Sequence, residues 1–127
     1  MTRAATAFRR DERPFVSLSG RSEFSRLYRE GLRSRVGSVV VLAASGVSGA
    51  ARVGFVAGRR VGNAVERNRA KRRLREAMAR IAPRDGMTFV VIAQPGVNGA
   101  AFSQLVCWLD DACRESCESV DSEENDE

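Results

Sequence analysis

The sequence predicts an α+β protein in which helices pack on a β-sheet as a two-layer α/β sandwich. Three short runs rich in β-branched residues have the length of strands, at residues 36–44, 52–57 and 88–93. Longer segments between and around these runs repeat apolar residues at helical spacing. The chain has 127 residues, which is enough for one domain with a single modest core.

The first half of the chain predicts one helix followed by a pair of strands. Residues 19–31 carry apolar side chains at i, i+3 and i+4, and Gly31 is a typical helix end. The strand runs 36–44 and 52–57 are separated by a glycine-containing turn at residues 45–50. This pattern favours a hairpin between the two runs.

The most informative segment is the helix predicted for residues 63–81. Asn63 is a favourable N-cap, and Glu66 three residues later completes the pattern of a capping box. Apolar residues recur at i, i+4, i+7, i+8 and i+11 and form one stripe along the helix. The members of this stripe are Ala70, Leu74, Ala77, Met78 and Ile81. Pro83 ends the helix.

The second half closes with the strand at 88–93 and an amphipathic helix that begins near residue 100. We expect residues 1–17 to be a flexible basic arm, 18–115 to form the single domain, and 116–127 to be an acidic, disordered tail. No apolar run approaches the roughly 20 residues of a membrane helix, and the start lacks the apolar core of a secretory signal. A cytoplasmic location is therefore the expectation.

Charge is distributed very unevenly along the chain. Residues 1–84 hold 20 basic and 6 acidic side chains, whereas residues 85–127 hold 1 basic and 10 acidic ones. A strongly basic body points to a polyanionic partner, most often nucleic acid, although a charged surface kept for solubility is the alternative. Arginine, which supplies all but one of the basic residues, binds phosphates with two parallel hydrogen bonds and stacks on bases.

The chain offers no obvious metal site. It contains three cysteines, Cys107, Cys113 and Cys117, and no histidine. A structural zinc ion needs four ligands, so we interpret these residues as reduced thiols and expect no cofactor bound by the protein alone.

On a helical wheel, the helix 63–81 has a broad basic wall opposite its apolar stripe. Only Glu66 and Glu76 are acidic in this segment. A solvated helix usually places glutamate four residues from arginine, whereas like charges at this spacing repel and destabilise the helix. The wall therefore predicts a polyanion bound along this helix.

Residues 62–77, GNAVERNRAKRRLREA, closely resemble the RNR signature of the bacterial ribonuclease P protein component. The similarity runs from about residue 18 to residue 109 and includes the helix at 23–31 and the strands at 52–55 and 90–93. The sequence departs from the family at Ala57–Gly58, where a Val-Ser pair is common, and at Gln94, where an arginine is common.

The resemblance implies a fold and a function beyond what periodicity shows. It implies a central four-stranded sheet with a short first strand, in the order α-β-β-β-α-β-α, with a left-handed βαβ crossover against the usual right-handed rule. It also implies a protein, monomeric apart from RNA, that has no catalytic residues of its own. Such a protein binds the catalytic RNA subunit of ribonuclease P and the 5′ leader of precursor tRNA, and assists endonucleolytic removal of that leader. Mg²⁺ is then used by the RNA subunit.

The basic wall and the resemblance together give two sets of candidate site residues. The RNA-binding set is Arg59, Arg60, Arg67, Asn68, Arg69, Lys71, Arg72, Arg73 and Arg75. The leader-cleft set is Phe24, Tyr28, Phe55, Arg67 and Asn68. Aromatic faces stack on single-stranded bases with about 1–3 kcal/mol per base. For Phe24 and Tyr28, ordinary core packing is the alternative.

Other classes of function are less compatible with the sequence. Glu66 and Glu76 lie about 15 Å apart along the helix, too far to share a metal ion, so a self-sufficient protein nuclease is disfavoured. A generic RNA-binding or ribosome-associated module remains an alternative. A DNA-binding protein is a third candidate, but its arginines should line one reading edge instead of spreading around the helix.

Overall fold

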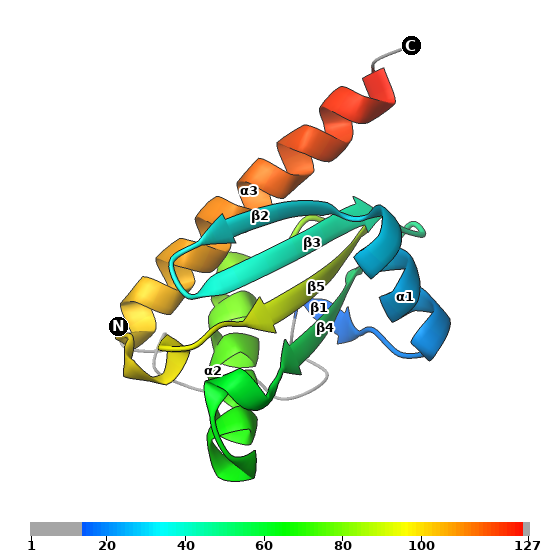
Figure 1. Ribbon diagram of the computed structural model, residues 1–127. Coiled ribbons are helices and arrows are strands. Elements are labelled where there is room, and N and C mark those ends of the chain that lie inside the picture. The colour runs from blue at the N-terminus through cyan, green and yellow to red at the C-terminus, as the bar shows by residue number, and fades with distance from the viewer. Residues whose placement is uncertain (1–13, 126–127) are drawn as a thin grey trace.

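The computed structural model describes residues 14–125, which form an α+β fold around one mixed sheet (Figure 1). The strands in chain order are β1 (Phe15–Ser17), β2 (Leu32–Val36), β3 (Val39–Ser45), β4 (Ala51–Ala57) and β5 (Met87–Ala93). The α-helices are α1 (Arg21–Glu30), α2 (Ala64–Ile81) and α3 (Phe102–Asn125). Two short 3₁₀ turns, η3 (Arg59–Val61) and η4 (Val97–Gly99), precede α2 and α3.

The strands lie in the spatial order β1-β4-β5-β3-β2. Strand β4 is parallel to both of its neighbours, β1 and β5, whereas β3 is antiparallel to β5 and to β2. Helix α2 connects the adjacent parallel strands β4 and β5 and crosses behind the sheet in Figure 1. This connection is the left-handed crossover that the family resemblance implies.

The two faces of the sheet are covered unequally. Helices α2 and α3 pack together on one face and bury the larger core, which includes Phe89, Leu74 and Leu105. The other face carries a smaller cluster of Leu18, Val40, Leu42 and Val90, on which α1 packs through Leu27. Because α1 is a single short helix, it covers only part of this second face (Figure 1).

The pairing of the strands corrects the expected hairpin. The run 36–44 does not form a hairpin with 52–57, because β5 lies between β3 and β4. Strand β3 is buried from Val39 to Ala43 and is paired on both sides, and its hairpin partner is β2. The spacing of apolar residues alone did not predict strand β2, because exposed arginines interrupt its apolar residues.

The limits of the folded part also differ from those expected. The sheet has five strands in place of four, because β1 adds to the edge of β4 and buries Phe15 within the segment expected to be a flexible arm. Helix α3 continues to Asn125 through most of the segment expected to be a disordered tail. Its buried side chains Cys113, Cys117 and Val120 extend the apolar stripe by further turns, which outweighs the polar composition there.

Candidate nucleic-acid interface

Helix α2 is anchored to the fold by one narrow apolar stripe. Ala70, Leu74, Ala77 and Met78 are completely buried, as the sequence predicted, and Ile81 is partly buried. The predicted capping box is also confirmed. The side-chain oxygen of Asn63 accepts a hydrogen bond from the backbone N–H of Glu66 at 2.9 Å, and the Glu66 carboxylate accepts one from the backbone N–H of Asn63 at 3.0 Å.

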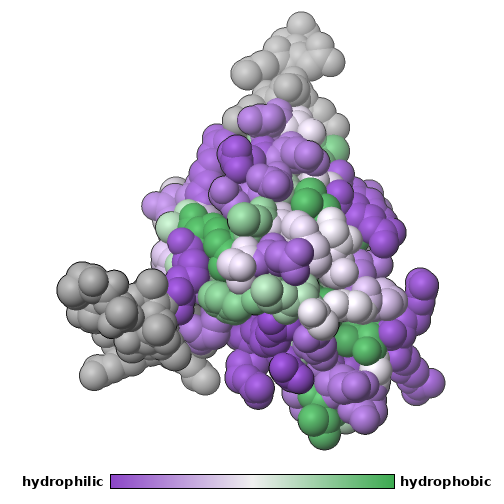
Figure 2. Space-filling model, turned by 90° about the vertical axis from the view of Figure 1, so that its left-hand side faces the viewer, coloured by the Kyte–Doolittle hydropathy of each residue, from purple (hydrophilic) through white to green (hydrophobic). Residues whose placement is uncertain are grey.

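The first turns of α2 extend beyond the end of the sheet and are exposed to solvent. Of residues 63–69, all but Arg67 are exposed, and burial begins at Ala70. In Figure 1 this end of the helix projects below the strands. Figure 2 shows that the surface of this lower part of the molecule is mostly hydrophilic. The signature residues therefore lie on an accessible projection.

Most of the predicted basic wall carries charge that the protein does not neutralise. Within residues 14–125, none of Arg59, Arg60, Arg69, Lys71 and Arg72 makes an ion pair or a side-chain hydrogen bond. Glu66, the acid nearest in sequence to Arg59, Arg60 and Arg69, uses its carboxylate in the cap. The positive end of the helix dipole adds to this field at the N-terminus of α2. Such an arrangement attracts phosphate groups.

Three further cations of the predicted wall are partly buried and contact the protein itself. The Arg67 guanidinium donates to the carbonyl oxygen of Gly62 at 3.0 Å, and Arg75 lies over the ring of Phe55 at 5.5 Å from its centroid. Arg73 donates to the carbonyl oxygens of Val97 at 3.0 Å and Ala100 at 2.5 Å.

Arg73 therefore has a role that the helical wheel did not reveal. Its two hydrogen bonds fasten the loop between β5 and α3 to the middle of α2. Asn98 of the same loop donates to the backbone carbonyl of Glu66 at 2.9 Å. Burial, together with the positive charge of Arg69, lowers the pKa of Arg73. Its guanidinium thus has contacts within the protein, and its expected place in the RNA-binding wall stays a prediction.

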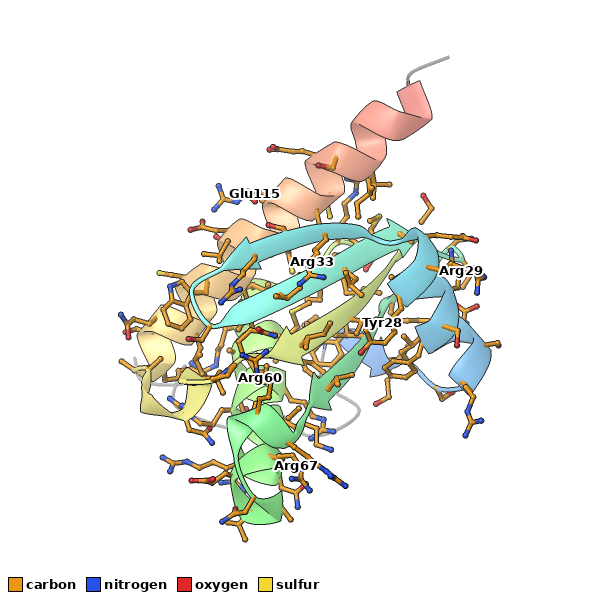
Figure 3. All side chains as sticks on the ribbon, viewed as in Figure 1. Tyr28, Arg29, Arg33, Arg60, Arg67 and Glu115 are labelled. Carbon is orange, nitrogen blue, oxygen red and sulfur yellow. The ribbon has the colours of Figure 1, made fainter. Side chains whose placement is uncertain are left out.

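The second candidate region is the part of the sheet that α1 leaves uncovered. Tyr28 projects from α1 on this side of the sheet (Figure 3) and is 54% exposed. Partial burial raises the pKa of its hydroxyl, which therefore stays neutral at physiological pH. On the same face of the sheet as α1 lie Val56 and Ile92, which are opposite each other on β4 and β5 and are half-buried. We call Val56 and Ile92 the open strip.

The aromatic residues of the predicted leader cleft do not all lie on one face. Phe24 packs directly on the backbone of β4, since a Cβ atom on Gly54 would lie 2.4 Å from the Cζ atom of Phe24. The next residue, Phe55, points to the opposite face, where its ring lies 5.9 Å from that of Phe15. The assignment of Phe55 to the leader cleft was therefore wrong. Successive side chains of a strand alternate between faces, and Gly54 takes the position opposite α1.

The open strip lies next to the basic wall because the chain passes directly from one to the other. Val56 is the penultimate residue of β4, and Arg59 and Arg60 follow three and four residues later in η3. Figure 3 places Arg60 and Arg67 beyond the ends of the strands and Tyr28 on α1. Sequence reasoning did not identify Val56 and Ile92, because both lie in continuous apolar runs, VGFVA at 53–57 and FVVIA at 89–93, in which no polar residue marks the exposed face.

The described residues give no sign of a metal-dependent or thiol-dependent active site. No group of three or more histidine, cysteine, aspartate or glutamate residues in this part of the chain is arranged to hold a metal ion. Burial strongly raises the pKa of Cys113, whose thiol is therefore unreactive at neutral pH. Within the same residues, no helix is long and apolar enough to cross a membrane. Fold and surface together define an α+β protein with an exposed basic face of the kind that binds nucleic acid.

Comparisons with known proteins agree with this class. The model of the family named Ribonuclease P matches residues 13–116. A ribonuclease P protein component of Symbiobacterium thermophilum is 42% identical over 91 residues, which is 69% of this chain and 79% of that protein. Another, of Gluconacetobacter diazotrophicus, is 48% identical over 59 residues, and the match spans 44% of this chain and 51% of the relative.

Solved structures show the same fold. The ribonuclease P protein of Thermotoga maritima superposes with a TM-score of 0.69 at 25% identity, covering 78% of this chain and 96% of that one. The Staphylococcus aureus protein gives a TM-score of 0.67 at 23% identity, covering 77% of this chain and 92% of that one. The chain belongs to the family of bacterial ribonuclease P protein components, the protein subunits of a ribonucleoprotein endoribonuclease that processes tRNA.

The position of Arg73 leads to a stability prediction. Arg73→Ala removes the guanidinium donor from the carbonyl of Ala100 and leaves the carbonyl of Val97 with only the backbone N–H of Ala100, so the free energy of unfolding should fall by about 1–3 kcal/mol. Arg72→Ala, one residue away and exposed, should change it by no more than about 0.5 kcal/mol. Urea denaturation of both variants measures the difference. Equal effects at the two positions would show that the contacts of Arg73 do not stabilise the fold.

Proposed function

We propose that this chain serves ribonuclease P through two separate surfaces. The first is the unpaired part of the basic wall, comprising Arg59, Arg60, Arg69, Lys71 and Arg72, which binds the catalytic RNA subunit. The second is the open strip with Tyr28 and Phe24, which binds the single-stranded 5′ leader of precursor tRNA. The uncompensated charge of α2 is the observation that carries the proposal, because it lowers the stability of the helix unless an anion is bound.

The division of labour follows from the chemistry of each surface. Guanidinium forks on an exposed helix bind the phosphates of a folded RNA without reading its bases. The half-buried apolar surface beside Tyr28 suits unstacked bases, because aromatic and apolar side chains bind any base by its face. Asn68, exposed beside Arg67 and Arg69, adds a neutral donor and acceptor at the same end of α2.

The protein supplies no group for cutting the phosphodiester bond in this proposal. The catalytic RNA subunit performs the cleavage with its own Mg²⁺, and the protein lowers the Mg²⁺ requirement by neutralising phosphates and holding the leader. We propose that the chain is monomeric apart from RNA and acts in the cytoplasm, where its RNA partners are made.

Reconstitution with the catalytic RNA tests the proposal as a whole. At low Mg²⁺, the full chain should strongly stimulate cleavage of precursor tRNA by the RNA subunit, because it replaces cations that otherwise screen the phosphates. RNA binding without stimulation would support a generic RNA-binding module instead. Preference for duplex DNA over the RNA subunit would contradict both readings.

The contribution of the basic wall is measurable from salt dependence. Arg69→Ala and Arg72→Ala should each weaken binding of the RNA subunit and reduce the slope of log affinity against log salt by about 1 for each lost phosphate contact. Filter binding over a range of KCl concentrations measures this slope. Arg114→Ala on α3, where the guanidinium is paired with Asp110 and Asp111, is the matched control and should leave the slope unchanged. A slope unchanged in all three variants contradicts the assignment.

The contribution of Tyr28 is specific to the leader. Tyr28→Ala should lower the affinity of the holoenzyme for precursor tRNA about 5- to 100-fold, which corresponds to the stacking of one base, and should leave mature tRNA unaffected. Tyr28→Phe keeps the ring and should retain most of the affinity. Equal losses for precursor and mature tRNA would indicate a folding defect in place of a leader contact.

A further inference from the structure

Two arginines of the edge strand β2 lie on the same face of the sheet as α1. Arg35 is opposite Val40 of β3, and Arg33 is opposite Leu42. Residues directly opposite one another on neighbouring strands point to the same side. Because Val40 and Leu42 belong to the cluster beneath α1, both guanidinium groups lie on that face.

These two arginines carry free charge. Both side chains are exposed, and neither makes an ion pair or a side-chain hydrogen bond with any residue between 14 and 125. Glu115 of α3 accepts a hydrogen bond from the hydroxyl of Ser34. Ser34 lies between the two arginines in sequence and therefore points to the opposite face, toward α3. Strand β2 thus separates its positive side from the acidic helix behind it.

The arginines stand at the ends of two rows of side chains that cross the sheet. One row runs from Val56 through Ile92 and Val40 to Arg35. The other runs from Gly54 through Val90 and Leu42 to Arg33, and α1 covers it with Phe24 and Leu27. The first row begins with the open strip. A single strand of nucleic acid that binds the strip and continues along this row reaches Arg35.

The direction of this path follows from the place of α2. Helix α2 packs against β4 and β5, whereas β2 is at the far edge of the sheet, three strand spacings or about 14 Å from β4. Figure 3 shows this separation, with Arg60 and Arg67 beyond the strand ends and Arg33 on β2, on the same side of the sheet as Tyr28 and Arg29 of α1. A strand of RNA that starts near α2 reaches β2 last.

We propose that Arg33 and Arg35 form a second contact for the 5′ leader, binding backbone phosphates of nucleotides farther from the cleavage site than those on the open strip. This inference rests on the proposed function, which places the catalytic RNA on α2 and the leader on the strip. The two side chains are about 7 Å apart along the strand, so each can hold a different phosphate. Guanidinium forks bind phosphate in bidentate geometry, and neither arginine is paired with a carboxylate of the described residues, since the acid nearest in sequence, Glu30 of α1, is paired with Arg29.

Leader length provides the test. The holoenzyme is assembled from the full chain and the catalytic RNA, and its affinity is measured for mature tRNA and for precursors with leaders of about two and about ten nucleotides. Arg33→Gln and Arg35→Gln should each weaken binding of the long-leader precursor about threefold to tenfold and should not change the other two affinities. The slope of log affinity against log salt should fall by about 0.7 per variant, for the long leader alone.

Control variants separate a phosphate contact from a general effect of charge or folding. Arg114→Gln removes the same charge from α3 on the other side of the sheet and should bind all three RNAs like the unaltered chain. Arg33→Lys and Arg35→Lys keep the charge and should preserve the salt slope while losing part of the affinity. A thermal melt of each variant checks that the fold is intact.

The outcomes distinguish this inference from the proposed function. If Tyr28→Ala lowers the affinity for precursor tRNA alone but the Arg33 and Arg35 variants bind long-leader precursors normally, the second contact is refuted and the proposed role of the open strip is retained. Equal losses for mature tRNA and precursors would place the arginines on the tRNA body and would also refute it. If the unaltered holoenzyme does not distinguish precursor from mature tRNA, the proposed leader site itself fails.

Discussion

Helix α2 packs on the rest of the fold through one narrow apolar stripe, while much of its remaining surface carries cations that repel one another. The packing of Ala70, Leu74, Ala77 and Met78 provides the attachment, and the small alanines let the helix approach the sheet and α3 closely. Arg73 adds a polar fastening to the loop that precedes α3. Since most of the stability of a helix in a protein comes from packing, this attachment tolerates a run of like charges that would weaken the helix alone.

The same attachment explains why charge is available for binding. The capping box uses the carboxylate of Glu66, and the acids of the last part of the chain are on α3, where Asp110 and Asp111 pair with Arg114. Exposed ion pairs contribute little to stability, so a fold does not require each surface arginine to have a partner. The segregation of charge leaves a basic end at α2 and an acidic helix behind β2. RNA is thereby attracted to one side of the molecule and repelled from the other.

The proposed leader surface exists because α1 covers only part of one face of the sheet. Helix α1 has only ten residues, and it packs over Gly54, Leu42 and Val90 while Val56 and Ile92 remain half-exposed. Exposed apolar surface of this kind is expected where a ligand binds. The strip is close to the basic end of α2 because both follow the carboxyl end of β4 within a few residues.

The sequence by itself determined the local elements and the family. The stripe of α2, its capping box and its run of arginines depend on residues a few positions apart, so spacing alone revealed them. The tertiary structure decided which strands are neighbours, which face each side chain occupies and which arginine is used internally. Phe55 follows Gly54 directly in the sequence, yet its side chain lies on the other face of the sheet. Arg72 and Arg73 are neighbouring arginines of one helix, and only the contact of Arg73 with the loop at Val97 distinguishes their roles. Similarly, residue spacing alone did not predict β2, which the family resemblance implied as a short first strand and its pairing with β3 shows. These outcomes depend on contacts between residues far apart in the chain, which the spacing of residues along a single helix or strand does not encode.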